Sequence, residues 1–327
     1  MKKFINAVDD LVPDSVAGLV MAHEELLVLN ADPLFVHRRT AKQGRVALVS
    51  GGGSGHEPLH TGYVGPGMLD AACPGLVFTA PAPDQIAAAA QRVDAGQGVL
   101  LIVKNYAGDC ASFQMASDML DMDHLTLLIN DDVAVENSTH ITGRRGVAGT
   151  VVVEKMVGAA AESGADLDEC KALGDRVNAS TASMGVAFTS CIVPDAAVPT
   201  FDIGPDEMEV GVGIHGEPGR YRRSIMPADR IVALLLEAVL KDLRLSAGRE
   251  LLLHVNGFAG TPLIELHLLN RIASEQLRRE GFKVRRWLVG NHTTSLEMAG
   301  ASITLTALDD ELLSLWDAPV TTASLRW

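Results

Sequence analysis

Short apolar runs alternate along the chain with longer segments in which apolar residues recur at helical spacing. The short runs are rich in Val, Leu and Ile, which is typical of buried strands, whereas the longer periodic segments predict helices. In the first half the pattern predicts strands over 46–50, 76–79, 99–104 and 125–130, and a helix over 83–95. Strands that alternate with helices indicate an α/β protein.

The second half repeats this alternation after a long helical segment that runs from Arg145 to about Asn178 and is interrupted at Ser163-Gly164. The strand pattern restarts at 183, and a chain of this length favours two domains of ~100–200 residues each. We therefore predict two α/β domains, over 1–182 and 183–327, each a mostly parallel or mixed sheet flanked by helices. The further predicted elements are strands at 207–214, 251–256, 285–290 and 301–308, helices at 228–243 and 261–279, and a short final helix.

The composition narrows the class of protein. With 47% hydrophobic and 21% charged residues the chain is globular, and 27 basic against 41 acidic residues give a net charge of -14, which disfavours binding to nucleic acid. No apolar stretch reaches the ~20 residues of a membrane span, and Asp9, Asp10 and Asp14 interrupt any signal-peptide pattern. Four cysteines without a CxxC pair predict neither a disulfide framework nor a zinc site, so we expect reduced thiols in the cytoplasm.

A glycine-rich segment, Gly-Gly-Gly-Ser-Gly-His-Glu-Pro at 51–58, directly follows the predicted strand 46–50. Glycines allow a ligand to approach the backbone closely at the carboxyl end of a parallel sheet; the alternative is a tight strand-to-helix connection without a ligand. The segment lacks the lysine of a phosphate-binding Walker loop, and His56 stands where a dinucleotide fingerprint or a hydrolase elbow around Ser54 requires glycine. These three motifs are therefore excluded.

A second polar segment, 104–109, begins at the end of the strand 99–104 and places Lys104 and Asp109 near the same sheet edge. We expect His56 and Asp109 to meet there, because a carboxylate that orients an imidazole builds a general acid/base pair. Asp109 fits a helix N-cap equally well, since the residues after it have a helical pattern, and the two roles are compatible.

A third segment, 211–219, carries His215 at the end of a predicted strand with glycines on both sides. Few neighbouring side chains are available to pack against this imidazole, which favours a ligand role over a structural one. Asp131 and Asp132 fit either a site or a helix cap, and the segment Thr142–Gly146 either contacts an anion or holds solvated or paired arginines. The remaining candidates for metal ligands lack the required spacing; they are His140, His254, His267 and His292.

The motifs of the chain resemble, in order, those of the dihydroxyacetone kinase family, and in particular of its ketose-binding subunit. The resemblance covers nearly the whole chain. It rests on SGGGSGHEP (50–58), ACPG (72–75), KNYAGD (104–109), NDDVAV (130–135), GRRGVA (143–148), GVGIHGEPG (211–219) and SLWDAPV (314–320).

The resemblance implies the roles of individual residues. His215 is expected to hold the ketone carbon covalently as a hemiaminal, while His56 acts as an acid/base residue and Asp109 shares that work. The terminal hydroxyl would lose its proton to them as it attacks a phosphoryl group. The residues expected to bind the ketose are Gly53, Ser54, Gly55, His56, Lys104, Asp109 and His215.

The resemblance also implies partners, because single-chain members carry a helical nucleotide domain beyond the region where this chain stops, at Trp327. We expect no cofactor or metal in this chain, a separate nucleotide-binding subunit with ADP or ATP and magnesium, recharging by a phosphocarrier protein, and a homodimer. Direct use of ATP by the separate subunit is the alternative. The connection 240–250 is shorter than the family pattern, which bears on partner docking or substrate choice.

Two other functions remain open at this point. The substrate could be a four-carbon ketose such as erythrulose, because one sequence does not reveal the volume of a pocket. The chain could also be a non-catalytic paralogue that senses a ketose and activates an operon; the presence of both His56 and His215 argues against this.

Overall fold

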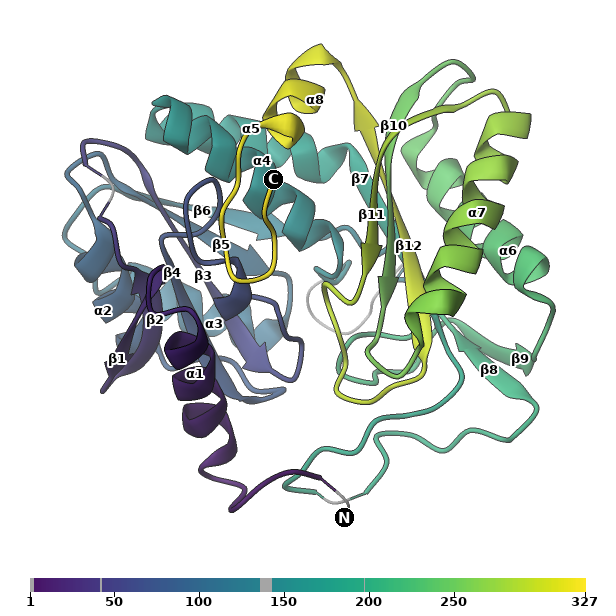
Figure 1. Cartoon of the computed structure of the whole chain (residues 1–327), viewed down its shortest axis with the longest axis horizontal. Helices are drawn as coiled ribbons and strands as arrows, with labels where there is room; N and C mark the ends of the chain where they lie inside the picture. Colours follow the sequence, from purple (N-terminus) through teal and green to yellow (C-terminus); the bar gives the residue numbers. More distant parts are fainter. Residues whose placement is uncertain (1–2, 42, 136–142, 197) are drawn as a thin grey trace. The chain divides into compact units, whose positions relative to one another are not determined.

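Figure 1 shows the computed structural model of the chain, which describes residues 3–41, 43–135, 143–196 and 198–327. The structure divides into two compact units. The first comprises Met1–Ile129, Val152–Arg176 and Ser314–Trp327, and the second comprises Asn130–Val151 and Val177–Leu313.

The predicted boundary between 182 and 183 differs from this division, because each unit is assembled from separate stretches of chain. The last residues pack in the first unit, where the amide of Thr321 donates to the carbonyl of Pro66 at 2.9 Å. The amide of Ser183 donates to the carbonyl of Asp131 at 2.8 Å within the second unit. Long-range hydrogen bonds of this kind leave no local signal at a sequence boundary.

The first unit is built on a six-stranded mixed sheet in the order β1-β2-β4-β3-β5-β6. The strands β4, β3, β5 and β6 are parallel, and a β1–β2 hairpin adds two antiparallel strands at one edge. Its elements are α1 (Leu11–Ala22), β1 (Leu27–Ala31), β2 (Leu34–Arg38), β3 (Ala47–Ser54), the 3₁₀ helix η1 (Thr61–Tyr63), β4 (Ala71–Val77), α2 (Pro83–Val93), β5 (Val99–Lys104), α3 (Ala107–Ser117) and β6 (His124–Ile129). The two helices that follow are α4 (Gly149–Ser163) and α5 (Leu167–Ala179).

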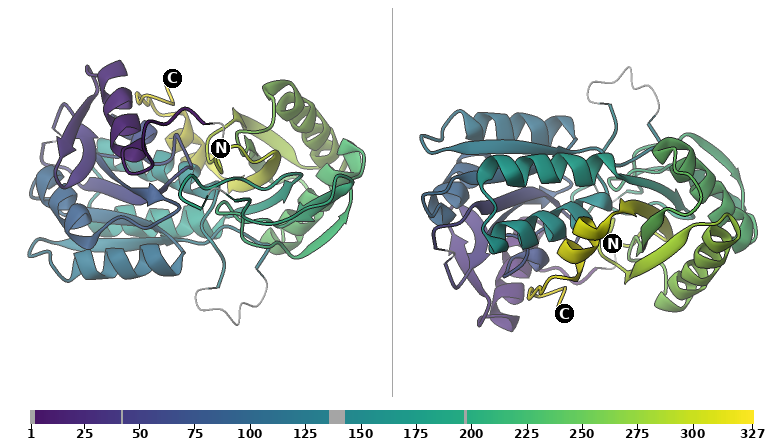
Figure 2. Two further views of the ribbon diagram at one scale, coloured as in Figure 1. Left: turned by 90° about the horizontal axis from the view of Figure 1, so that it is seen from below. Right: turned by 90° about the horizontal axis from the view of Figure 1, so that it is seen from above.

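The second unit contains another six-stranded mixed sheet, in the order β11-β10-β12-β7-β8-β9. Figures 1 and 2 show α6 and α7 covering the same face of this sheet, where Leu235, Leu253 and Leu305 are buried in its core. Its elements are β7 (Thr181–Ala187), β8 (Glu207–Val210), β9 (Tyr221–Ser224), α6 (Ala228–Leu243), β10 (Glu250–Gly257), α7 (Leu263–Arg279), β11 (Lys283–Gly290) and β12 (Gly300–Leu308). The last helix, α8 (Asp310–Asp317), begins in the second unit and ends in the first.

The predicted fold class, two α/β layers with mixed sheets, is confirmed, and the elements with strong local patterns agree closely. β5 and α6 have the predicted bounds, 99–104 and 228–243, and the break between α4 and α5 falls at Ser163-Gly164 as predicted. The strand expected at 76–79 lies instead at 71–77, because Phe78 adopts a left-handed conformation (φ 57°) that ends it. Over the described part of the chain, no helix combines the length and apolar character needed to cross a membrane.

Candidate functional site

The glycine-rich segment is the end of a strand, since β3 continues as far as Ser54. A Cβ atom on Gly52 would lie 2.1 Å from Nζ of Lys104, and one on Gly53 would lie 2.7 Å from the Cα of Phe78. Any larger residue would therefore displace the neighbouring lysine or the backbone after β4. Close packing accounts for these two glycines, in addition to any access for a ligand.

The next two predicted binding residues are engaged within the segment itself. The hydroxyl of Ser54 donates to the carbonyl of Gly75 at 2.7 Å, which ties the end of β3 to β4. The amide of Gly55, a residue with φ 100°, donates to the carboxylate of Glu57 at 3.0 Å. The turn that presents the following histidine is thus fixed on both sides.

His56 is 1% exposed and stacks on the ring of Phe78, with centroids 5.0 Å apart and an angle of 12° between the planes. Stacking of this kind holds the orientation of an imidazole without using its nitrogens. The left-handed backbone of Phe78 thus positions the ring against which His56 is held.

Lys104, the last residue of β5, is fully buried and uses its three donors within the protein. Its Nζ lies 3.2 Å from Oδ2 of Asp109, 3.1 Å from Nε2 of His60 and 3.4 Å from the carbonyl oxygen of Gly51. Asp109 is buried in the first turn of α3, whose N-cap is Tyr106, so the capping alternative for this carboxylate is wrong. It pairs with the ammonium group of Lys104, which makes the pair a buried salt bridge.

A buried network behind Lys104 was not predicted from the sequence. Nδ1 of His60 lies 2.7 Å from Oε1 of Glu154 and 3.0 Å from Oγ of Ser50, whose hydroxyl donates to the carbonyl of Ile102 at 2.8 Å. Because the ammonium of Lys104 donates to Nε2, we assign the imidazole proton to Nδ1, which donates to Glu154.

Burial controls the charges in this network. It lowers the pKa of His60 well below its usual value, and the nearby charges of Lys104 and His56 lower it further. Burial also raises the pKa of Glu154 to about 8, although the charge of Lys104 and the nearby hydroxyl of Ser50 act in the opposite direction. Both groups are therefore neutral at pH 7, while Lys104 and Asp109 form the charged pair.

Two sequence signals pointed to this network in retrospect. Glu154 directly follows the apolar run Val-Val-Val near the start of α4, and a carboxylate on a buried stretch of a helix requires a partner. His60 lies four residues after His56 in the same polar segment. The contact between His60 and Glu154 joins residues 94 positions apart in the chain, and a single sequence does not reveal such a contact.

In the second unit, His215 lies in the connection between β8 and β9 and is half-buried, with a side chain that is 17% exposed. Its Nδ1 lies 3.0 Å from Oε1 of Glu217, and its amide donates to Oε2 of the same carboxylate at 2.9 Å. A Cβ atom on Gly213 would lie 1.9 Å from Oε2 of Glu217, so this glycine is needed for the carboxylate to fold back.

The carboxylate of Glu217 places a proton on Nδ1 of His215. Burial alone would raise the pKa of Glu217, but the hydrogen bond and charge of His215 and the guanidinium of Arg145 lower it to about 2. A carboxylate can only accept hydrogen bonds, so Nδ1 of His215 carries a proton, and in the tautomer with this proton alone the lone pair is on Nε2. Such an imidazole can act as a nucleophile through Nε2.

Asp131, which follows β6, stabilises the start of α4. Asp131 is buried and accepts hydrogen bonds from the amides of Val147 and Gly149 at 2.8 and 2.7 Å and from the hydroxyl of Ser183 at 2.5 Å. It therefore satisfies backbone donors at the start of α4, which is the capping role rather than the site role.

The arginines of the predicted 142–146 segment are paired, as one of the two interpretations held. Nε of Arg145 donates to Oδ2 of Asp132 at 2.8 Å, and another of its nitrogens donates to the carbonyl of Gly211 at 2.8 Å. Arg144 forms a bidentate ion pair with Asp242 on α6. Thr142 of this segment and His140 lie outside the described residues.

The structure thus brings some of the predicted site residues into contact. Lys104 and Asp109 form an ion pair in the first unit, which also contains His56, and His215 belongs to the second unit. Over the residues that the structure describes, no group of three or more His, Cys, Asp or Glu side chains is arranged to hold a metal ion.

Comparison with known proteins identifies similar chains over nearly the full length. The family model of the Dak1 domain matches residues 17–324. The dihydroxyacetone-binding subunit DhaK of PTS-dependent dihydroxyacetone kinase 1 from Listeria innocua is 49% identical over 314 residues, which is 95% of each chain.

Two solved structures have the same fold at 32% identity and a TM-score of 0.89. One is the dihydroxyacetone kinase of C. freundii, of which the match covers 99% of this chain and 60% of that chain. The other is the dihydroxyacetone kinase operon co-activator DhaQ, with 95% of this chain and 96% of that chain covered.

Proposed function

The chain belongs to the Dak1 domain family, and from this premise we propose that it is the dihydroxyacetone-binding subunit of a dihydroxyacetone kinase. It binds the ketose, and a separate subunit transfers the phosphoryl group to give dihydroxyacetone phosphate. The observation that carries this proposal is the pair of His215 and Glu217, which holds an imidazole in the tautomer that suits attack on a carbonyl.

The ketose is held as a hemiaminal on His215. Nε2 attacks the carbonyl carbon, a C–N bond forms and the π bond of the carbonyl breaks. The carbonyl oxygen takes up one proton from solvent, while Nδ1 releases one through Glu217 to solvent, so the adduct is neutral and contains every atom of both reactants. The role of Glu217 is to keep Nδ1 protonated until attack and then to receive its proton.

His56 and Asp109 act as the acid/base residues for the terminal hydroxyl of the ketose, and the segment Gly53–Gly55 binds the ketose together with them. Lys104 contributes through Asp109, because its three donors are used by protein acceptors. The stacking of His56 on Phe78 supports this assignment, since it holds the imidazole in one orientation. Proton transfer from the hydroxyl to such a group raises its nucleophilicity toward phosphorus.

The donor side of the reaction belongs to other chains. A nucleotide with magnesium, bound by a separate subunit, supplies the phosphoryl group, and a phosphocarrier protein of the phosphotransferase system recharges it in the cytoplasm. The relative from Listeria innocua, named as PTS-dependent, supports this donor over direct use of ATP. We also propose a homodimer, which is supported by the exposed apolar side chains of Leu263, Ile264 and Leu268 on α7.

A second candidate function is supported by the match to an operon co-activator, which is as similar in fold as the kinase. A sensor of this kind would bind the ketose and a regulator without transferring phosphate. Production of a phosphate ester by the chain together with its nucleotide-bearing subunit separates the two functions. Parallel assays with dihydroxyacetone and erythrulose separate the three-carbon from the four-carbon substrate.

The proposed capture on His215 is tested by mass spectrometry of the intact protein under native conditions after incubation with dihydroxyacetone. We expect a mass increase of one ketose for the wild type, none for His215→Ala, and an unchanged increase for His267→Ala, which alters an exposed histidine on α7. An adduct that persists in His215→Ala would refute capture at this residue.

A further inference from the structure

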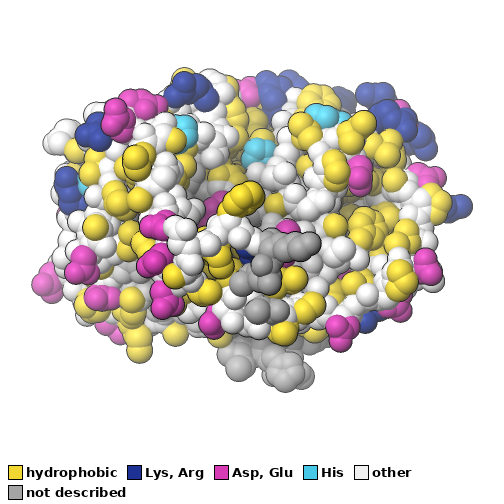
Figure 3. Space-filling view, turned by 60° about the horizontal axis from the view of Figure 1, so that its bottom comes forward, with side chains coloured by type: hydrophobic (Ala, Val, Ile, Leu, Met, Phe, Trp, Pro, Cys, Tyr) yellow, Lys and Arg dark blue, Asp and Glu magenta, His cyan; other side chains and the backbone are white. Residues whose placement is uncertain are grey.

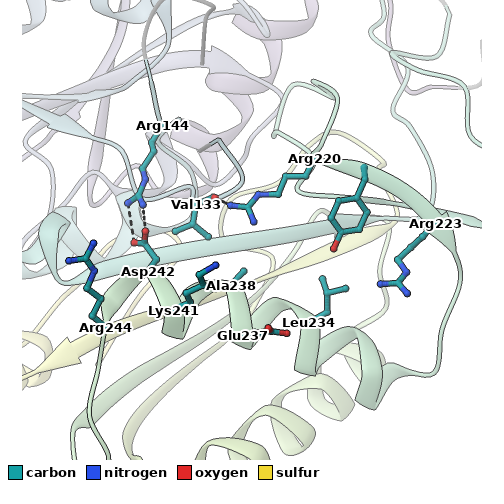
Figure 4. Close-up of a pocket in the computed structure, with 11 residues that line it drawn as sticks. Val133, Arg144, Arg220, Arg223, Leu234, Glu237, Ala238, Lys241, Asp242 and Arg244 are labelled. Carbon is teal, nitrogen blue, oxygen red and sulfur yellow. Dashed lines mark hydrogen bonds and ion pairs between the residues drawn. The ribbon is translucent and has the colours of Figure 1, made fainter. Parts of the chain in front are cut away.

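A cavity of about 490 Å³ in the second unit is bordered by more basic than acidic side chains (Figure 4). Five of the lining residues are cationic and two are acidic. They are Arg144, Arg220, Arg223, Lys241 and Arg244, with Glu237 and Asp242. This local excess of positive charge contrasts with the net charge of -14 of the whole chain and with the interspersed acidic and basic side chains in Figure 3.

Two of the arginines form a fixed wall of the cavity. Arg144 makes a bidentate ion pair with Asp242, and Arg220 donates to the backbone carbonyls of Val133 and Ala134. These contacts hold both guanidinium groups in one place, as the dashed lines in Figure 4 show for the pair with Asp242. A fixed guanidinium loses little further entropy when it binds a ligand.

The other cations come from two different elements. Lys241 and Arg244 lie at the carboxyl end of α6, where the helix dipole favours positive charge, so their presence alone has a structural explanation. Arg223 does not share this explanation, because it is exposed on β9 and is directed toward the same cavity in Figure 4. Two unrelated elements therefore supply cations to one concave surface.

These three cations are not neutralised within the part of the chain that the structure describes. Neither Arg223 nor Lys241 nor Arg244 forms an ion pair or side-chain hydrogen bond with a described residue. Like charges that border one cavity repel one another, and an anion that enters the cavity relieves this repulsion. The exposed carboxylate of Glu237 supplies only part of the compensation.

We propose that this cavity binds a small phosphate monoester. A dianionic phosphate matches several convergent guanidinium and ammonium donors, and arginine binds it with two parallel hydrogen bonds. The volume is in the range of small-molecule sites, and the apolar side chains of Leu234 and Ala238 offer contact for a carbon skeleton next to the phosphate. This site is separate from the proposed ketose capture on His215 and goes beyond the proposed function.

The test uses glycerol 3-phosphate as the probe and isothermal titration calorimetry on the full chain at constant ionic strength. We expect saturable binding by the wild type and no binding of uncharged glycerol. The double variant Arg223→Gln/Arg244→Gln should weaken binding about a hundredfold, since each charge-assisted contact corresponds to about tenfold. The control Arg271→Gln/Arg279→Gln removes the same charge from exposed positions on α7 and should leave binding within about twofold.

Three results would overturn the proposal. The first is the absence of saturable binding by the wild type, and the second is an equal loss in the control, which would indicate attraction to net charge alone. The third is loss of binding in His215→Ala while the cavity variant keeps it, because the ester would then occupy the proposed ketose site. Failure of ketose capture in the mass-spectrometric test leaves the cavity proposal unaffected, so the two fail separately. Circular dichroism of each variant confirms that it is folded.

Discussion

The substitution Glu154→Gln tests the charge state of the buried network directly. The side chain of Glu154 is fully buried on α4, with Oε1 at 2.7 Å from Nδ1 of His60. Burial raises the pKa of this carboxyl to about 8, despite the opposing effects of Lys104 and Ser50. Glutamine has nearly the same shape as the protonated acid and its carbonyl can still accept from His60, but it cannot ionise.

The expected effect follows from the difference between the folded and unfolded pKa values of Glu154. The folded pKa lies above the unfolded one, 4.5, so the folded state binds more protons between pH 4.5 and about 8. Its contribution to stability is therefore complete below pH 4.5 and is lost as the pH rises through this window. At about 1.4 kcal/mol for each pH unit, the loss is on the order of 5 kcal/mol. The variant should equal the wild type within about 1 kcal/mol at pH 5 and exceed it by several kcal/mol at pH 8.

The assay is urea unfolding at pH 5, 6, 7 and 8, followed by tryptophan fluorescence. Trp316 and Trp327 belong to the first unit, as Glu154 does, whereas Trp287 belongs to the second. A Trp287→Phe background therefore makes the signal report the unit that contains the substitution. The matched control is Glu275→Gln, which replaces a more exposed carboxylate on α7.

The decisive quantity is the difference between variant and wild type as a function of pH. A difference that stays constant from pH 5 to pH 8 would show that Glu154 ionises in the folded protein as it does in the unfolded chain. A variant that is less stable than the wild type at pH 8 would show that the carboxylate is ionised and stabilised by Lys104. Either result would refute the neutral Glu154–His60 pair.

Three further predictions concern other parts of the site. Gly52→Ala places a methyl group 2.1 Å from Nζ of Lys104, so thermal unfolding should show destabilisation of about 1–3 kcal/mol. Phosphoryl transfer should also be slower. A variant with the stability and activity of the wild type would contradict the close packing. Glu217→Gln removes a carboxylate whose lowered pKa, about 2, adds stability that is present above pH 4.5 and lost on acidification toward pH 2. When the unfolding free energy is measured as a function of pH, the variant should not show this loss. Parallel curves for variant and wild type would contradict the stabilising role of Glu217. Asp131→Ala deprives two buried amides of their acceptor and should lower the unfolding free energy by about 3 kcal/mol in urea, against about 1 kcal/mol for Asp166→Ala at the exposed start of α5.

The sequence predicted those elements whose own residues carry a strong pattern. In β5 every residue is apolar except the terminal Lys104, and all are buried, so a strand could be predicted from composition alone. The helix α6 combines a buried apolar face with a polar one over 16 residues. In both cases local preference and tertiary burial agree, which is the condition for a correct prediction.

Other elements exist because of their neighbours rather than their own residues. β9 is exposed along its whole length and has no alternating pattern, so its pairing with β8 determines that it is a strand. β4 contains the sequence Ala-Cys-Pro-Gly, which is typical of a turn, yet pairing with β2 and β3 on either side keeps it extended. Non-local hydrogen bonds of this kind are invisible in one sequence.

For the site, the sequence located the chemical groups but not their partners. His56, Lys104, Asp109 and His215 could be predicted as site candidates because each lies at or shortly after the end of a predicted strand, near glycines. The partners decide what these groups can do. Glu217 could have been found from its position two residues after His215, because a tight glycine turn lets a carboxylate reach back to the preceding imidazole.

The buried charges of the network around Lys104 follow a simple rule, one ionised carboxylate for one ammonium. A charge removed from water requires an opposite charge or several hydrogen bonds, and Lys104 has both. If Glu154 were also ionised, the network would carry a second negative charge without a second cation; its raised pKa keeps it neutral instead. The counter-charge of Lys104 is therefore Asp109. Any proton that the ketose hydroxyl gives to Asp109 would leave the ammonium without this counter-charge, which favours His56 as the group that finally holds the proton.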